Sequence, residues 1–259
     1  VLFRSMCAIY KKELRAYLTS MTGYIFMAVL LAVTSLYYVA NCLVGGYPVF
    51  GAILSSVYFV LLIIVPVLTM RSMAEEKRQK TDQLLMTAPV SLWKIVLGKY
   101  LAMVTIFLIS MAILCLYPLI LLQFGSVSLP MAYTAILGYT LFGAACLAIG
   151  LFLSAVTESQ VIAAVLSFVV LFVSYMMKGI TGIISSDGNV LTKIMNCFDI
   201  YSPFEKFAGG CLDITAVVYY LTVIALLNFL TVQSIQKRRW SISKKTFSDR
   251  KSTRLNSSH

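Results

Sequence analysis

Charged side chains gather in one stretch of the chain, from Arg71 to Lys99. Its sequence, RSMAEEKRQKTDQLLMTAPVSLWKIVLGK, carries six Lys or Arg residues and three acids, and long apolar runs flank it on both sides. Charges of both signs at an interface mainly set the orientation of binding and the rate of encounter. We interpret the stretch as a cytoplasmic loop that folds as short helices and docks onto a soluble partner.

The residue types that most enzymes need are scarce. The only histidine is His259, so residues 6–248 hold no Ser-His-Asp triad, Cys-His pair or His-based metal site. The six cysteines show no CxxC spacing, which argues against zinc. We therefore expect no catalytic, cofactor-binding or metal residues in this chain. Cys197 and Cys211 could form a disulfide or remain free thiols, and both alternatives are open.

The rest of the chain is built to cross a membrane. It is 60% hydrophobic and 12% charged, whereas soluble domains carry roughly 25% charge. A transmembrane helix needs about 20 apolar residues. The sequence predicts an all-α integral membrane protein with six transmembrane helices, at Met21–Val44, Phe50–Met70, Leu97–Leu122, Met131–Val156, Val161–Met177 and Ile214–Ile235.

Two further segments lie outside these spans. Residues 6–20 put Ile9, Leu14, Tyr17 and Leu18 on one helical face and Lys11, Lys12 and Arg15 largely on the other. This pattern predicts an N-terminal interfacial helix, with a solvated lead-in to the first span as the alternative. Residues 178–213, between spans five and six, are too polar to cross and too apolar for a free loop. We expect short re-entrant or interfacial helices there.

Small residues recur in the fourth span, where Gly138, Gly143 and Gly150 stand among alanines. Small side chains allow helix backbones to approach closely. We expect this face to pack within the chain in preference to forming a dimer seam.

Basic residues fix the orientation, because positively charged loops stay in the cytoplasm. They cluster before span one, between spans two and three, and after span six, all on one side if there are six spans. We expect a multi-pass protein of the cytoplasmic membrane with both termini in the cytoplasm. The net positive charge suits anionic lipid headgroups, so we expect the bilayer and no nucleic acid as a partner.

Residues 6–248 form a single transmembrane domain in this interpretation. The flanking residues 1–5 (VLFRS) and 249–259 (DRKSTRLNSSH) resemble in-frame translations of sequencing adapters. We expect both flanks to be non-native and leave them out of the fold.

The polar stretch contains helix signals. Ser72 and Glu75 have capping-box spacing, which predicts a helix start at Ser72, and Pro89 ends the pattern. Thr81, Leu84, Leu85 and Ala88 share one face. An exposed apolar stripe on such a loop is expected to be shielded from water. A partner could cover it, or the protein's own helix ends or lipid headgroups could, and the residues alone leave both alternatives open. Trp93 and Tyr100 suit the membrane interface.

The string EEKRQKTDQLLMTAPVSLWKIVLGK resembles the loop of the type-2 ABC exporter permeases, whose pattern is roughly E-E-(K/R)-(K/R)-x-G-T-x-E-x-L-L-x-x-P-(V/I)-(S/T) followed by G-K. The segment KKELRAYLTS resembles the amphipathic entry helix of that family. The segments IYSPFEKFAGG and KRRW are similar to its last-loop and tail signatures, especially in the gliding-motility and copper-enzyme-maturation branch. Lys80 stands where the family usually has Gly, and Gln83 where it has Glu. The second departure puts an ion pair at that position in doubt.

The resemblance implies a permease subunit that pairs with a second copy or a paralogue. A separate ABC ATPase subunit would bind the loop and hold ATP and Mg, since this chain has no GxxxxGK[ST] loop. The residues implied in ATPase docking, as a cytoplasmic coupling helix between spans two and three, are Glu75, Glu76, Lys77, Arg78, Thr81, Gln83, Leu84, Leu85 and Pro89.

Two other functions compete with an exporter subunit. An integral membrane enzyme needs acids, histidines or a metal cluster within the membrane, and an ion-coupled carrier or channel usually places ionisable groups at mid-membrane. The spans offer essentially none of these. Their Tyr, Thr, Ser and Met side chains mildly favour amphipathic or lipid-like cargo.

Overall fold

A computed structural model describes residues 2–46, 49–78, 91–123, 127–184 and 198–256. This part of the chain is helical and contains no strand. The elements, in chain order, are α1 (Leu2–Thr19), α2 (Met21–Tyr38), the π-helical turn η1 (Val39–Val44), α3 (Phe50–Arg78), α5 (Leu92–Leu114), α6 (Tyr117–Leu121), α7 (Leu129–Val156), α8 (Gln160–Ile184), α10 (Tyr201–Ala208) and α11 (Ile214–Asn256).

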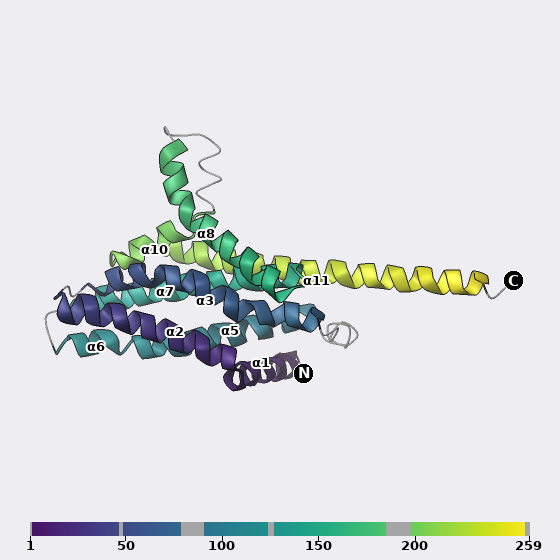
Figure 1. The fold of residues 1–259 in the computed structure, drawn as a ribbon, viewed down its shortest axis with the longest axis horizontal. Coiled ribbons are helices and arrows are strands. Elements are labelled where there is room, and N and C mark those ends of the chain that lie inside the picture. The colour runs from purple at the N-terminus through teal and green to yellow at the C-terminus, as the bar shows by residue number, and fades with distance from the viewer. Residues whose placement is uncertain (1, 47–48, 79–90, 124–126, 185–197, 257–259) are drawn as a thin grey trace.

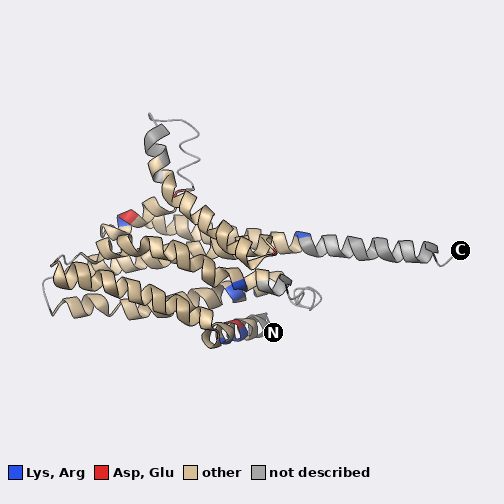
Figure 2. Ribbon diagram, in the orientation of Figure 1, with Lys and Arg blue, Asp and Glu red and all other residues tan. Residues whose placement is uncertain are grey.

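Six apolar helices confirm the predicted number of membrane spans. Their bounds lie within a few residues of the predicted ones, at Met21–Val44, Phe50–Ala74, Leu92–Leu121, Leu129–Val156, Gln160–Met177 and Ile214–Lys237. In Figure 1 α2, α3, α5 and α7 run side by side along one axis, α8 is inclined to them, and α11 continues beyond the bundle toward the C-terminus. In Figure 2 the described charged residues lie toward the two ends of the bundle. The chain is therefore a multi-pass, all-α membrane protein.

Helix α7 is the centre of the bundle, and its glycines explain why. A methyl group at Gly138 would overlap Phe207 of α10, one at Gly143 would overlap Phe107 of α5, and one at Gly150 would overlap Thr69 of α3. These three helices reach α7 because it lacks side chains at those points. The expected packing of this face within the chain is confirmed.

The third span is broken near its end, where α5 stops at Leu114 and α6 begins at Tyr117. Pro118 occupies the first turn of α6, where its missing N–H is tolerated. The Tyr117 hydroxyl lies 2.6 Å from the Ser35 hydroxyl of α2. This contact holds the short helix against the bundle.

Helix α10 is a short helix packed into protein, as expected for the segment between spans five and six. Phe204 and Phe207 are fully buried, and the Phe204 ring lies against Tyr139 and Phe142 of α7. The preceding residues are also held, because Ser174 of α8 donates to the Phe198 carbonyl at 2.6 Å. Cys211 follows α10 with a free, exposed thiol, and Cys197 lies outside the described residues.

Tyr100 differs from its prediction as an interface aromatic. It is 6% exposed, and its hydroxyl donates to the Ala144 carbonyl of α7 at 2.9 Å. Trp93 is 42% exposed, which fits the membrane interface, and it lies against Phe229 of α11.

We predict that Gly138→Ala loosens α10. The added methyl group meets the Cβ of Phe207, which cannot move without the α10 backbone, so we expect a loss of about 1–3 kcal/mol from overpacking. Gly179→Ala is the control, because no atom lies within 4 Å of a Cβ there, and we expect it to be neutral or stabilising by ~0.5–1 kcal/mol. Thermal unfolding in detergent compares them. Equal melting temperatures for both variants would contradict the packing described for α7.

Candidate functional site

The predicted docking residues fall at the end of α3 and beyond it. Glu75, Glu76, Lys77 and Arg78 form the last turn of α3, where the structure describes the backbone and not the side chains. Thr81, Gln83, Leu84, Leu85 and Pro89 lie outside the described residues, as does the apolar face predicted for Thr81, Leu84, Leu85 and Ala88. The structure therefore describes the two helices that hold this segment, α3 before it and α5 after it (Figure 1).

The predicted helix start at Ser72 is wrong. Helix α3 passes through Ser72 without a break, so the residue is no N-cap. Its hydroxyl is buried with no hydrogen-bond partner among the described residues. The capping-box spacing also occurs by chance inside helices, and here the apolar run of the second span carries the helix onward. A separate coupling helix between spans two and three stays a prediction.

A buried lysine joins the two helices that hold the predicted docking segment. The Lys99 ammonium of α5 donates to the Ser72 carbonyl of α3 at 3.1 Å and to Glu13 Oε1 of α1 at 3.0 Å. We call Lys99, Glu13 and the Ser72 carbonyl the Lys99 junction. Three helices that are distant in sequence meet at this one ammonium group.

Burial makes the Lys99 junction sensitive to the loss of either charge. The Lys99 side chain is 2% exposed and that of Glu13 is 14% exposed. Moving a charge out of water costs several kcal/mol, and this cost is recovered only where an opposite charge and hydrogen bonds are well placed. Glu13 and the Ser72 carbonyl supply both, so the geometry of the three helices is tied to an intact ion pair.

Neighbouring contacts fix α1 on α5. A side chain at Gly98 would press on Ile9 of α1, whose Cγ2 lies 3.0 Å from the position of a Cβ. The Tyr10 hydroxyl lies 2.9 Å from the Thr105 hydroxyl of α5. The apolar face predicted for residues 6–20 thus packs on protein, and the buried Tyr17 is part of the core.

Helix α7 reaches the same part of α3 through one hydroxyl. Ser154 Oγ accepts hydrogen bonds from the backbone N–H groups of Met73 and Ala74, at 3.2 and 3.1 Å. A side chain that inserts between helix backbone groups in this way is a common site of bending. The end of α3 is therefore attached to the central helix as well as to α5.

Arg71 anchors the other side of α3 to the first span. Its guanidinium donates to the Ser20 hydroxyl at 2.9 Å. Ser20 is the N-cap of α2 and accepts from the Thr22 N–H. Arg71 therefore holds the elbow at which α1 turns into α2.

Sequence reasoning placed Lys99 in the polar loop and did not single out Glu13 or Ser154. Glu13 had a usable signal, because it is the one acid among the basic residues of KKELR and would face the same side as Tyr10 and Tyr17. Ser154 gave no such signal in the sequence, since the hydroxyl of a serine in an apolar helix most often bonds to a backbone carbonyl of its own helix.

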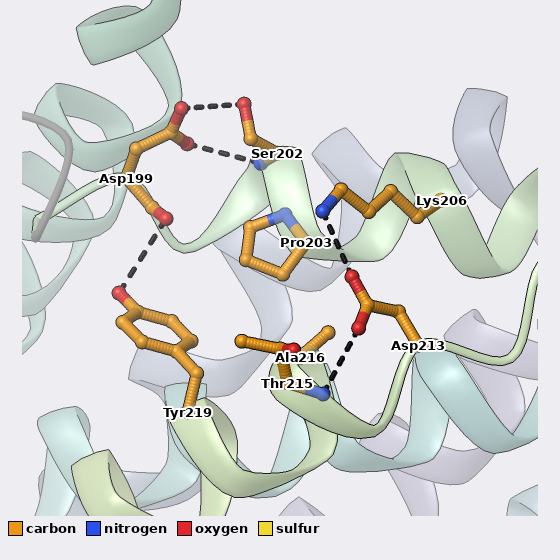
Figure 3. Close-up of a pocket in the computed structure, with 8 residues that line it drawn as sticks. All are labelled: Asp199, Ser202, Pro203, Lys206, Asp213, Thr215, Ala216 and Tyr219. Carbon is orange, nitrogen blue, oxygen red and sulfur yellow. Dashed lines mark hydrogen bonds and ion pairs between the residues drawn. The ribbon is translucent and has the colours of Figure 1, made fainter.

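A cavity of 370 Å³ lies at the other end of the molecule, beside α10 (Figure 3). Asp199 Oδ1 accepts from the N–H groups of Tyr201 and Ser202, both at 3.0 Å, and so caps α10. Asp213 Oδ1 accepts from the Thr215 N–H at 2.9 Å and caps α11. Its Oδ2 accepts from Lys206 at 2.8 Å, which lowers the pKa of the Asp213 carboxyl. These acids are occupied in holding helix ends.

The side chains of this arrangement hold helices in position. The described residues contain no group of three or more His, Cys, Asp or Glu residues placed to hold a metal ion. Both charged clusters, the Lys99 junction and the Asp199–Asp213 cavity, sit at the ends of membrane-spanning helices. What the geometry offers is a mechanical connection between a polar segment and a membrane bundle.

Comparison with known protein families identifies the family of this helical bundle. The family model described as "ABC-2 family transporter protein" matches residues 10–232, which is most of the chain. The chain belongs to the ABC-2 transporter family. Within this family it is a permease, the membrane subunit of an ABC transporter. A search of curated proteins found no match. The matched region contains all three residues of the Lys99 junction and the predicted docking segment.

We predict that Glu13→Gln destabilises this permease. Removing one partner of a buried ion pair typically costs about 3–5 kcal/mol, because the other charge stays buried. Glu13→Leu combined with Lys99→Met should recover most of that loss, since an apolar pair of similar volume is often tolerated. Thermal unfolding in nanodiscs measures both. A single variant as stable as the parent would show that the pair does not hold α1 on α5.

Proposed function

We propose that this permease is the membrane subunit of an ATP-driven exporter in the cytoplasmic membrane. A separate ABC ATPase subunit binds the segment between α3 and α5 and hydrolyses ATP with Mg. A second permease, identical or paralogous, completes the complex. Both termini face the cytoplasm, and the substrate leaves the cell. Assignment to the gliding-motility and copper-enzyme-maturation branch rests on the sequence resemblance alone.

The Lys99 junction is the observation that carries this proposal. The ATPase-docking segment can drive transport only if its movement reaches the spans. Lys99 in α5 is bonded to the Ser72 carbonyl near the end of α3, so the helices before and after the segment are tied together. Glu13 extends the tie to α1 and Ser154 extends it to α7. A force on the segment therefore acts on four helices at once.

An ion-coupled carrier or channel is less well supported. The six spans contain no Asp, Glu or His, whereas such proteins place ionisable groups on their conduction path. The charged residues in the spans are Arg71, Lys94, Lys99 and Lys237, all near the same end. Arg71 and Lys99 are bonded to neighbouring helices, which is a structural use.

We predict that Leu84→Asp combined with Leu85→Asp abolishes ATPase binding. These leucines supply the apolar face of the docking segment, and each is worth about 1.5–3 kcal/mol if fully enclosed. Two aspartates would place charge in that contact. Copurification from solubilised membranes should show loss of the ATPase subunit, with normal expression and melting temperature of the permease.

Lys80→Gln is the matched control, because it lies in the same segment outside the apolar face, and we expect it to retain the ATPase. If the double variant binds the ATPase with unchanged affinity, docking takes place elsewhere. The short turn at Thr157–Gln160, between α7 and α8, would then be tested next.

The orientation yields a separate prediction. A reporter fused after Trp240 should be active only in its cytoplasmic form, because an even number of spans brings the C-terminus back to the side of the basic N-terminus. Fusions after Gly210, between α10 and α11, should report the opposite side. Activity on the outer face from the Trp240 fusion would overturn the proposed orientation.

A further inference from the structure

The outward face of α1 is basic. Lys11, Lys12 and Arg15 are exposed, and so are the small residues Ala8 and Ala16 that stand between them on the helix. The only acid of this helix, Glu13, is turned away and bonded to Lys99. The face therefore carries three positive charges with no negative charge beside them on the same helix.

This face is unsuited to burial in hydrocarbon. The large apolar residues Tyr10, Leu14, Tyr17 and Leu18 pack against the core of the bundle. Between residues 6 and 19 there is no exposed large hydrophobic side chain. A helix that inserts into a bilayer needs such residues on its free side. The outward face of α1 presents positive charges at the ends of long, flexible side chains.

The position of α1 along the bundle places this face at the level of lipid headgroups. It meets α5 at Gly98 and Lys99, and Gly98 is six residues, about 9 Å, beyond the first residue of α5. Trp93, five residues before Gly98, is exposed as at a membrane interface. Leu101, one turn later, is exposed as toward lipid tails. The helix thus lies at the boundary between headgroups and hydrocarbon.

We propose that anionic lipid headgroups bind the outward face of α1 through Lys11, Lys12 and Arg15. The complementary chemistry is a phosphate with net negative charge, as in phosphatidylglycerol. Each basic residue near such a surface contributes roughly fivefold in affinity. Because Glu13 on the opposite face of α1 holds Lys99, bound lipid also steadies the Lys99 junction. The bilayer thereby becomes part of the connection between the docking segment and the spans.

The test compares two variants with the same change in charge. In Lys11→Gln/Lys12→Gln both substitutions lie on the proposed surface. In Lys94→Gln/Lys237→Gln both lie at the same end of the bundle on other helices, α5 and α11. Native mass spectrometry of the full chain, titrated with phosphatidylglycerol, measures binding. Thermal unfolding is compared in nanodiscs of pure phosphatidylcholine and of an equal mixture with phosphatidylglycerol.

We expect the Lys11/Lys12 variant to lose roughly 25-fold in phosphatidylglycerol affinity, at about fivefold per residue, and to lose the stabilisation by the mixed nanodiscs. The Lys94/Lys237 variant should lose clearly less of both, because its two charges stand singly on separate helices. Unchanged affinity in the first variant, or equal losses in the two, would overturn the proposal. So would loss of ATPase copurification by the Lys11/Lys12 variant in pure phosphatidylcholine, which would make the face a protein dock. Lipid binding is measured without the ATPase, so its failure leaves the proposed function standing.

Discussion

The ion pair between Lys99 and Glu13 is the constraint on which this permease depends. A buried ammonium group needs hydrogen-bond acceptors and an opposite charge. At this position a carboxylate from α1 and a carbonyl from α3 supply them, both at about 3 Å. Three helices consequently have little freedom to shift relative to one another while the pair is intact. The two helices that hold the predicted docking segment inherit this rigidity, which is what a segment that transmits force needs.

The remaining architecture extends the same constraint across the membrane. Helix α7 is attached to the end of α3 by Ser154 and accepts α10 against Gly138 at its far end. Phe204 and Phe207 of α10 are buried there, beneath a cavity whose acids hold helix ends. A continuous path of direct contacts therefore runs from the Lys99 junction to the opposite side of the bundle, through the helix with the smallest side chains.

Apolar periodicity and length sufficed to predict six spans, because the hydrocarbon core imposes both on any sequence that crosses it. The small residues of α7 predicted close helix packing, because small side chains allow helix backbones to approach one another. Partners across the bundle could not be predicted. Tyr100 is found in the core because tertiary contacts outweigh local patterns, and Ser72 lies inside α3 because the apolar run of the second span carries the helix past it. Lys99 was recognised as charged, but its burial depends on Glu13, 86 residues away.

We propose that nucleotide binding at the ATPase subunit moves α1 through the Lys99 junction. Electron spin resonance can measure this movement in the assembled complex as the distance between labels at Cys7 of α1 and Val218 of α11, both exposed, with the other cysteines replaced. We predict that ATP changes this distance in the parent protein and changes it clearly less in the Glu13→Leu/Lys99→Met variant, in which Ile9 and Tyr10 still contact α5. An equal change of distance in both proteins would contradict the claim.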